Sequence, residues 1–253
     1  MAADSPAPRD AWAALRATTS ARIGLARSGS ALTTQDVLGF SLAHARARDA
    51  VETALDIDAL EASLAGQDVI RVHSAAANRA LYLRRPDLGR VLDAESAARL
   101  TPGAFDIALV IGDGLSSQAV HNHAAATAAQ MLARLAAYSV APIVIAEQAR
   151  VALSDEIGER LGARAVVMLI GERPGLSTPD SLGVYITFAP KRGRTDADRN
   201  CISNIHAAGL SYAAAADKTA WLLGEAFRLG FSGVALKDQQ GAPVLPGAPQ
   251  LPA

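Results

Sequence analysis

Asp106-Ile107-Ala108-Leu109-Val110-Ile111-Gly112-Asp113-Gly114-Leu115-Ser116 joins an uninterrupted apolar run to a glycine-rich turn. A segment of helical pattern follows it, from Ser116 or Ser117 to about Ala137. A short apolar run with no polar alternation is typical of a strand that is covered on both faces. The turn and the long helix behind it indicate a strand–helix unit of a parallel sheet.

The same pattern returns farther along the chain. Further strands are expected at Pro142–Ala146, Ala165–Ile170 and Leu182–Phe188, with a last short one at Gly233–Leu236. Helices are expected at about 151–161 and 212–229. Residues 104–236 therefore predict an α/β domain, a Rossmann-like and mainly parallel sheet with helices on both faces.

Residues 21–103 read as a small, mostly helical domain that precedes the sheet. Its longest helix is expected to begin at a threonine cap near Thr34 and to run to about Ala50. The expected buried side of that helix consists of Val37, Leu38, Leu42, Ala43 and Ala45. Shorter helices are expected at 58–65 and 93–100, a brief strand-like run at Val69–Val72, and a strand or helix end at Arg79–Arg85.

Both ends of the chain are expected to lie outside these domains. Residues 1–20 predict a flexible extension, and residues 237–253 a disordered, proline-bearing tail. Trp12, Leu15, Thr19 and Ile23 nevertheless fall at helical spacing, with arginines beside them. The segment is therefore either a frayed tail or a short amphipathic docking or address segment.

Composition narrows the function. The 253 residues include 24 basic and 25 acidic side chains, for a net charge of −1. That balance argues against broad binding to nucleic acid or to a membrane surface. A single cysteine excludes an internal disulfide, and the chain contains neither a charge-free run long enough to span a bilayer nor a visible secretory signal. A cytoplasmic protein is expected.

Ligands of open parallel sheets bind beyond the carboxyl ends of the strands. The segments expected there begin at Gly112, Glu147 and Gly171, and a fourth follows the strand at 182–188. That fourth segment is Asp198-Arg199-Asn200-Cys201-Ile202-Ser203-Asn204-Ile205-His206, which is too polar for a core element. All four segments are expected to share one edge of the sheet.

Each residue group at this edge has a purely structural interpretation beside the functional one. Gly112-Asp113-Gly114 is too short for a phosphate-binding fingerprint and favours a tight turn in which the aspartate caps the helix. His121 and His123 point to different faces of a helix, which disfavours a shared metal. Cys201 with His206 suggests a thiolate nucleophile, but a lone cysteine is more often inert. A stand-alone enzyme using Asp113 or Cys201 and His206, and a non-catalytic scaffold, both stay open.

Three separated motifs add a resemblance. Gly112–Ser116, Gly171–Leu176 and Asp198–His206 resemble the small subunit of ethanolamine ammonia-lyase. The likeness extends to Thr34-Gln35-Asp36 and Asp49-Ala50-Val51, and it covers roughly residues 20–236.

The resemblance implies one subunit of an adenosylcobalamin enzyme that converts ethanolamine to acetaldehyde and ammonia by radical chemistry. A large barrel subunit would bind ethanolamine, and this chain would cover the other side of the corrin. The corrin-contacting positions carried over are Val151, Glu172 and Cys201. No residue here is assigned a catalytic or metal-ligand role, and the resemblance also suggests a bacterial microcompartment as the site of action.

The histidines bear on the cobalt ligand. Many cobalamin proteins supply an axial histidine from an Asp-x-His-x-x-Gly motif. None of the five histidines has an aspartate two residues before it. We therefore expect the cofactor's own benzimidazole to stay on the cobalt.

Overall fold

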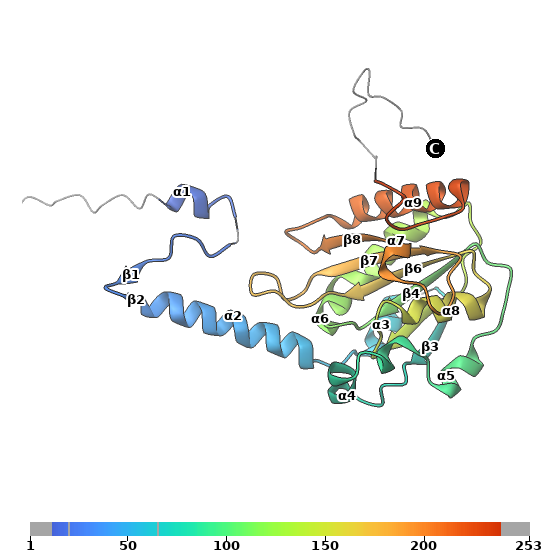
Figure 1. Cartoon of the computed structure of the whole chain (residues 1–253), viewed down its shortest axis with the longest axis horizontal. Helices are drawn as coiled ribbons and strands as arrows, with labels where there is room; N and C mark the ends of the chain where they lie inside the picture. The colour runs from blue at the N-terminus through green and yellow to red at the C-terminus, as the bar shows by residue number, and fades with distance from the viewer. Residues whose placement is uncertain (1–11, 20, 65, 239–253) are drawn as a thin grey trace, which may run out of the picture.

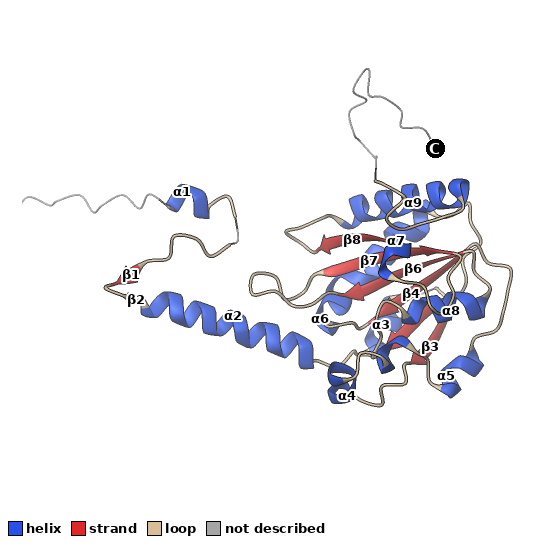
Figure 2. Cartoon of the chain, in the orientation of Figure 1, coloured by secondary structure: helices blue, strands red, loops and turns tan. Residues whose placement is uncertain are grey.

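The structure is a computed structural model that describes residues 12–19, 21–64 and 66–238. One six-stranded sheet forms its centre, with strand order β3-β5-β4-β6-β7-β8. The strands are β3 (Val69–His73), β4 (Ile107–Gly112), β5 (Ile143–Glu147), β6 (Ala165–Gly171), β7 (Leu182–Phe188) and β8 (Arg199–Ile205), beside a two-stranded hairpin of β1 (Arg27–Ser28) and β2 (Ala31–Leu32). Figure 2 shows the sheet in red between layers of helices.

The described α-helices are α1 (Ala13–Arg16), α2 (Thr34–Glu52), α3 (Ile57–Ser63), α4 (Arg79–Arg84), α5 (Ala94–Arg99), α6 (Ser117–Ala119), α7 (Ala125–Arg134), α8 (Leu153–Leu161) and α9 (Tyr212–Leu229). Two 3-10 turns, η1 (Leu88–Arg90) and η3 (Asp196–Asp198), and a π-helical turn, η2 (Val120–Ala124), complete them. The α/β prediction is confirmed, and the helix over 212–229 agrees at both ends.

The sheet is mixed. β3, β5, β4 and β6 pair in parallel, whereas β7 pairs antiparallel with both β6 and β8. The chain passes from β6 to β7 without a helix between them, and parallel neighbours need a long crossover. β7 is therefore antiparallel to the other strands of the sheet, and β8 is parallel to β6 again.

This topology corrects two predictions. Because β7 is reversed, its carboxyl end lies at the edge opposite to the ends of β4, β5 and β6. The polar stretch Asp198–His206 is mostly the edge strand β8 and not a loop, although β8 brings the chain back to the edge shared by the three parallel strands. A strand at Gly233–Leu236 was also wrong, since that segment consists of turns.

β3 connects the amino-terminal region to the sheet. It lies within the predicted helical domain, yet it pairs along its whole length with β5. The six-stranded sheet therefore extends across the predicted boundary at residue 103.

Two apolar layers hold the sheet. On one face α7 and α9 pack over the sheet, with α9 against β7 and β8. On the other face α8 packs against β4 and β6. β4 and β6 are buried at every residue, as their uninterrupted apolar runs predicted. The α8 side of β7 and β8 is less covered, and Cys201 and Ser203 are exposed there.

α2 projects from the sheet like an arm, with β1, β2 and α1 at its far end (Figure 1). Its cap is Thr33, whose hydroxyl accepts from Asp36 N, one residue before the predicted cap. The predicted buried side is not buried in this chain, because Val37, Leu38 and Leu42 are 47%, 64% and 52% exposed.

The ends are described only in part. Residues 12–19 include the single turn α1, while residues 1–11 and 20 of the predicted extension lie outside the described residues. Of the predicted tail, only Lys237 and Asp238 are described. No helix in the described ranges is both long and apolar enough to cross a membrane.

Candidate functional site

Two glycines fix the loops after β4 and β6 against each other. Gly114 has a φ of +58°, and a Cβ on it would lie 2.2 Å from the Gly171 carbonyl oxygen. A Cβ on Gly171 would lie 2.1 Å from the Ser116 carbonyl oxygen. Leu115 N donates to the Gly171 oxygen at 2.9 Å. Only glycine permits this approach of two backbones, which sets the position of the next residue, Glu172.

Asp113 is a structural anchor for the loop after β5. Its carboxylate is 2% exposed and accepts from Gln148 N at 3.0 Å and Ala149 N at 2.9 Å, with Arg79 Nη1 at 3.3 Å. Desolvation raises its pKa to about 6, against the lowering effect of these partners. The helix cap is instead Ser116, so the predicted capping role of Asp113 was wrong. A carboxylate so enclosed does not reach a substrate.

Tyr82 also supports the loop after β5. Its ring lies between two guanidinium groups, 4.8 Å from that of Arg79 and 4.3 Å from that of Arg150. Its hydroxyl donates to the Ala149 carbonyl at 2.9 Å. This stack and Asp113 together hold the backbone that leads into Val151.

A cavity of about 350 Å³ opens beside these loops. Its lining includes Val151 and Glu172, two of the three predicted contact residues, from the loops after β5 and β6. Tyr185 of β7 forms another wall. The parallel strands therefore bring Val151 and Glu172 to one place, as the edge argument predicted.

Glu172 is held in a defined position. Its Oε2 accepts from Ser181 Oγ at 2.6 Å, and its N–H donates to the Ser181 carbonyl at 2.9 Å. A Cβ on Gly183 would lie 2.8 Å from Oε1, so the glycine leaves room for the carboxylate over β7. Among the described groups Oε1 has no hydrogen-bond donor and stays available.

Cys201 joins the group through Tyr185. The two residues lie directly opposite each other on β8 and β7, which puts their side chains on the same face. Desolvation raises the pKa of the Cys201 thiol; the Tyr185 hydroxyl opposes the rise and the nearby Glu172 carboxylate adds to it. Cys201 is exposed and does not line the cavity. Tyr185, which lies opposite Cys201, does line it.

Tyr185 was missed by the sequence reasoning. It lies inside the apolar run Leu182–Phe188, where it reads as one more core residue. The available signal was its polar hydroxyl in a strand that is otherwise apolar apart from Thr187. Desolvation also raises the pKa of Tyr185, so its hydroxyl stays protonated.

The structure does not support a Cys201–His206 pair. Five residues of an extended strand span about 16 Å. His206 lies beyond the end of β8, where Nε2 contacts Asn204 Oδ1 at 2.9 Å and Nδ1 accepts from Ala208 N at 3.3 Å. A thiol with a raised pKa and no histidine beside it is a poor nucleophile.

His121 and His123 are engaged separately. His121 Nε2 accepts from Asp56 N at 2.8 Å, while His123 Nδ1 lies 2.8 Å from the Tyr212 hydroxyl. The two side chains therefore point apart, as predicted. Across residues 12–19, 21–64 and 66–238, no three His, Cys, Asp or Glu side chains group as a metal site.

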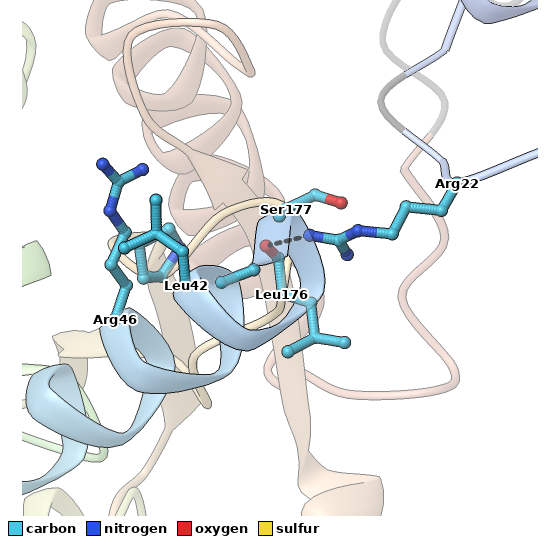
Figure 3. Close-up of a pocket in the computed structure, with 8 residues that line it drawn as sticks. Arg22, Leu42, Arg46, Leu176 and Ser177 are labelled. Atoms are coloured by element: carbon cyan, nitrogen blue, oxygen red, sulfur yellow. Dashed lines mark hydrogen bonds between the residues drawn. The ribbon is translucent and has the colours of Figure 1, made fainter. Parts of the chain in front are cut away.

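A second cavity, of about 290 Å³, lies where α2 meets the loop between β6 and β7 (Figure 3). Leu42 and Arg46 of the arm face Leu176 and Ser177 of that loop across it. Arg22 Nη2 donates to the Leu176 carbonyl at 3.4 Å and helps to tie the arm to the body. None of the predicted contact residues lines this cavity.

Fold and site together define an α/β protein with a candidate ligand site. Its described part offers a shaped cavity and an open sheet face, but no paired nucleophile and base. Comparison with known proteins makes the class specific. A sequence model of the family described as ethanolamine ammonia-lyase light chain (EutC) matches residues 9–237.

Individual relatives agree. The ethanolamine ammonia-lyase small subunit of Xanthomonas campestris pv. campestris is 54% identical, with 97% of this chain and 94% of the relative covered. That of Ralstonia nicotianae is 54% identical, with coverage of 96% and 94%, and that of Pseudomonas syringae pv. tomato is 52% identical, with coverage of 93% and 86%. The chain belongs to the ethanolamine ammonia-lyase small-subunit family and is a subunit of a heteromeric lyase.

Proposed function

We propose that this chain covers one side of adenosylcobalamin in ethanolamine ammonia-lyase, while a larger subunit binds ethanolamine and encloses the other side. The observation that carries the proposal is the gathering of Val151, Glu172 and Cys201 around Tyr185, beside a cavity and an exposed sheet face. Bound there, the cofactor would supply radical chemistry through homolysis of its cobalt–carbon bond.

The residues present fit such a group. A corrin is broad and flat, with an amide-bearing rim, and the less covered α8 side of β7 and β8, where Cys201 and Ser203 are exposed, lies beside the cavity. Arg150 of the cavity lining has a buried Nε without a hydrogen-bond partner in the described chain. The same is true of Arg79 Nη2, whose guanidinium stacks on Tyr82 of the lining, and of Gln148 Oε1, in the loop that leads to Val151. Unsatisfied buried groups are uncommon in folded proteins and fit a site completed by a ligand.

Each contact residue has a distinct part. Glu172 Oε1 would accept a hydrogen bond from a rim amide, because its other oxygen is already taken by Ser181. Val151 would give an apolar contact and a backbone group at the start of the α8 segment. Cys201 would pack as a small, protonated thiol against the ring or its substituents.

The cobalt ligand would come from the cofactor itself. His121, His123 and His206 each have hydrogen-bond partners within the chain. Because no histidine lies in the motif that usually replaces the cofactor's base, we expect the benzimidazole to remain coordinated. The nucleotide tail that carries this base would then lie on the side of the corrin that faces this chain.

The α2 arm is the part best suited to the large subunit. Val37, Leu38, Phe40 and Leu42 are each about half exposed or more. These side chains lie on more than one side of the helix, so a partner would have to cover it broadly. We expect an obligate interface on the order of 2,000 Å² or more.

Packaging is a further part of the proposal. The arginine-bearing segment at Trp12–Ile23 would address the enzyme to a bacterial microcompartment, since its apolar residues fall at helical spacing ahead of the arm. Deleting residues 1–19 should leave the activity of the purified complex intact and change its encapsulation. Loss of activity would give the segment a structural role instead.

Reconstitution tests the function as a whole. The chain should produce no acetaldehyde from ethanolamine by itself and should restore activity when mixed with the large subunit and adenosylcobalamin. Activity of the chain alone would revive the stand-alone enzyme. A complex that forms without taking up cobalamin would make the chain a scaffold.

A further inference from the structure

The cavity beside Val151 continues into a second one rich in arginine. This second cavity, about 450 Å³ in volume, shares Arg150, Val151 and Tyr185 with the first. Its lining adds Arg90, Arg194 and Arg199. We call it the arginine lobe, and four guanidinium groups around one open cavity need an explanation.

Two of the four arginines are neutralised within the chain. Arg199 forms a buried ion pair with Asp155 of α8 and a second with Asp196 at 3.0 Å. Arg194 Nη1 lies 3.4 Å from Asp198 Oδ1 and also donates to the Ala189 carbonyl. These pairs tie β8 and η3 to α8 and leave the wall of the lobe rigid.

Arg90 and Arg150 are different. Neither has an ion pair with any carboxylate of the described chain, which leaves two positive charges on the lobe without a counter-ion. Arg150 is held by its stacking on Tyr82 and by a bond from Nη2 to the Tyr82 carbonyl at 3.3 Å. Its Nε is buried and has no acceptor.

The fold also holds the backbones of the two arginines close to each other, and both residues line the same cavity. Arg150 N donates to the carbonyl of Gly89, the residue before Arg90, at 2.8 Å. A Cβ on Gly89 would lie 2.9 Å from Arg150 Cγ, so the η1 turn can approach the loop after β5 only with a glycine there. Two guanidinium groups that line one cavity without carboxylate partners are suited to an oxyanion with several acceptor oxygens.

We infer that Arg90 and Arg150 bind a phosphodiester anion in the arginine lobe, namely the one in the nucleotide tail of the cobalamin. This inference rests on the proposed function. The rim amides of the corrin are neutral, and the phosphodiester is the anionic group of the cofactor. The tail would lie on the side that faces this chain, and the lobe adjoins the cavity lined by Val151 and Glu172.

The test compares two corrinoids on the assembled complex with the large subunit. Adenosylcobinamide has the same corrin but lacks the phosphodiester and the benzimidazole. Arg150→Gln and Arg90→Gln should each weaken adenosylcobalamin binding by roughly ten- to hundredfold and leave adenosylcobinamide binding within about twofold. Arg84→Gln, which removes the same charge from the exposed end of α4, should change neither affinity.

Three further measurements guard the result. Arg150→Lys should recover part of the lost affinity. Arg90 is exposed, so its substitution should leave the fold intact, and circular dichroism would check this. Inorganic phosphate should compete with adenosylcobalamin but not with adenosylcobinamide. Assembly of the variants with the large subunit in the absence of cofactor should be unchanged.

Five outcomes would overturn the inference. Equal weakening of both corrinoids would give the arginines a general structural role, and no weakening of either would remove them from the site. Tight phosphate binding without competition would assign the lobe to a free phosphate compound. Loss of subunit assembly would make Arg90 and Arg150 interface residues. Failure of the wild-type complex to bind either corrinoid would remove the proposed function as well.

Discussion

Single residues at the site differ in how firmly the chain holds them. Glu172 is fixed through one carboxylate oxygen and free at the other, whereas Asp113 has both oxygens occupied. The first arrangement suits a group that waits for a ligand, and the second suits one that shapes a loop. Mutations at the two carboxylates should therefore have opposite signatures.

Glu172→Ala should weaken cobalamin binding to the complex by about 0.5–3 kcal/mol, because it removes an acceptor for a rim amide. Glu172→Gln keeps an acceptor oxygen and should lose less. The measurement is a spectroscopic titration of cobalamin into the complex. Glu95→Ala, which removes an exposed carboxylate of α5 paired with Arg99, is the control. Equal affinities for Glu172→Ala and wild type would contradict the assignment of Glu172.

Asp113 should make stability depend on pH in an unusual direction. Its folded pKa of about 6 exceeds the ordinary value of 3.8, so the folded protein holds the proton more tightly than the unfolded chain. The free energy of unfolding should therefore fall as pH rises from about 4 to 6, by up to about 3 kcal/mol from this group. Below pH 4 the contribution of this group is fully present.

Thermal unfolding of wild type and Asp113→Asn between pH 4 and 7 measures this effect. The wild-type protein should lose stability relative to the variant as pH rises. Parallel profiles would show that Arg79 and the two N–H donors cancel the desolvation. The opposite slope would show that these partners outweigh it.

Cys201 should behave as a packing residue. Its raised pKa keeps the thiol protonated near neutral pH, so alkylation by iodoacetamide should be slower than that of free cysteine at pH 8 and should still be rising above pH 9. The chain has no other cysteine to confuse the rate. Cys201→Ser should retain turnover in the complex. A fast, low-pH alkylation would indicate an activated thiolate.

At the scale of elements, the sequence predicted the strands that are buried on both faces of the sheet. The runs at 107–112, 143–147 and 165–171 are strands because central strands are apolar on both sides, and Gly112 and Gly171 end two of them. The same logic placed Val151 and Glu172 at one edge. The ten residues between β6 and β7 lack a helix, which was the available sign that β7 is antiparallel.

Other elements could not be predicted in this way. β8 alternates irregularly between buried and exposed residues because it lies at the sheet edge with one face bare, so its polarity resembled a loop. The contact of Tyr185 with Cys201 depends on register across two strands, which no local pattern encodes. Apolar residues on α2 predicted a buried side, but Val37, Leu38 and Leu42 are exposed.

The arm gives a prediction at this scale. Leu38→Glu in α2 should weaken assembly with the large subunit by at least tenfold, because a charge would enter an apolar contact. Leu229→Glu, at the exposed end of α9, is the matched control and should assemble normally. Sedimentation or light scattering of the mixed subunits measures the effect. Normal assembly of Leu38→Glu would direct attention to another surface.

At the scale of the whole molecule, pairing between strands that are far apart in the sequence builds the site. Val151 follows β5, Glu172 follows β6, and Tyr185 and Cys201 lie on β7 and β8, so four neighbouring strands contribute to one site. The α2 arm extends away from the sheet (Figure 1). Under the proposed function, the sheet side would bind the cofactor and the arm would bind the large subunit.

The edge position of β8 has a consequence for motion. A terminal strand with one neighbour is the part of a sheet most prone to local opening, and its amides should exchange with deuterium faster than those of β4 or β6. A ligand that binds only the closed form suppresses opening by RT ln(1 + [L]/Kd). Cobalamin should therefore slow exchange along 199–205 far more than along 107–112. By binding over one face of β8, the cofactor would stabilise the strand that has a neighbour on one side only.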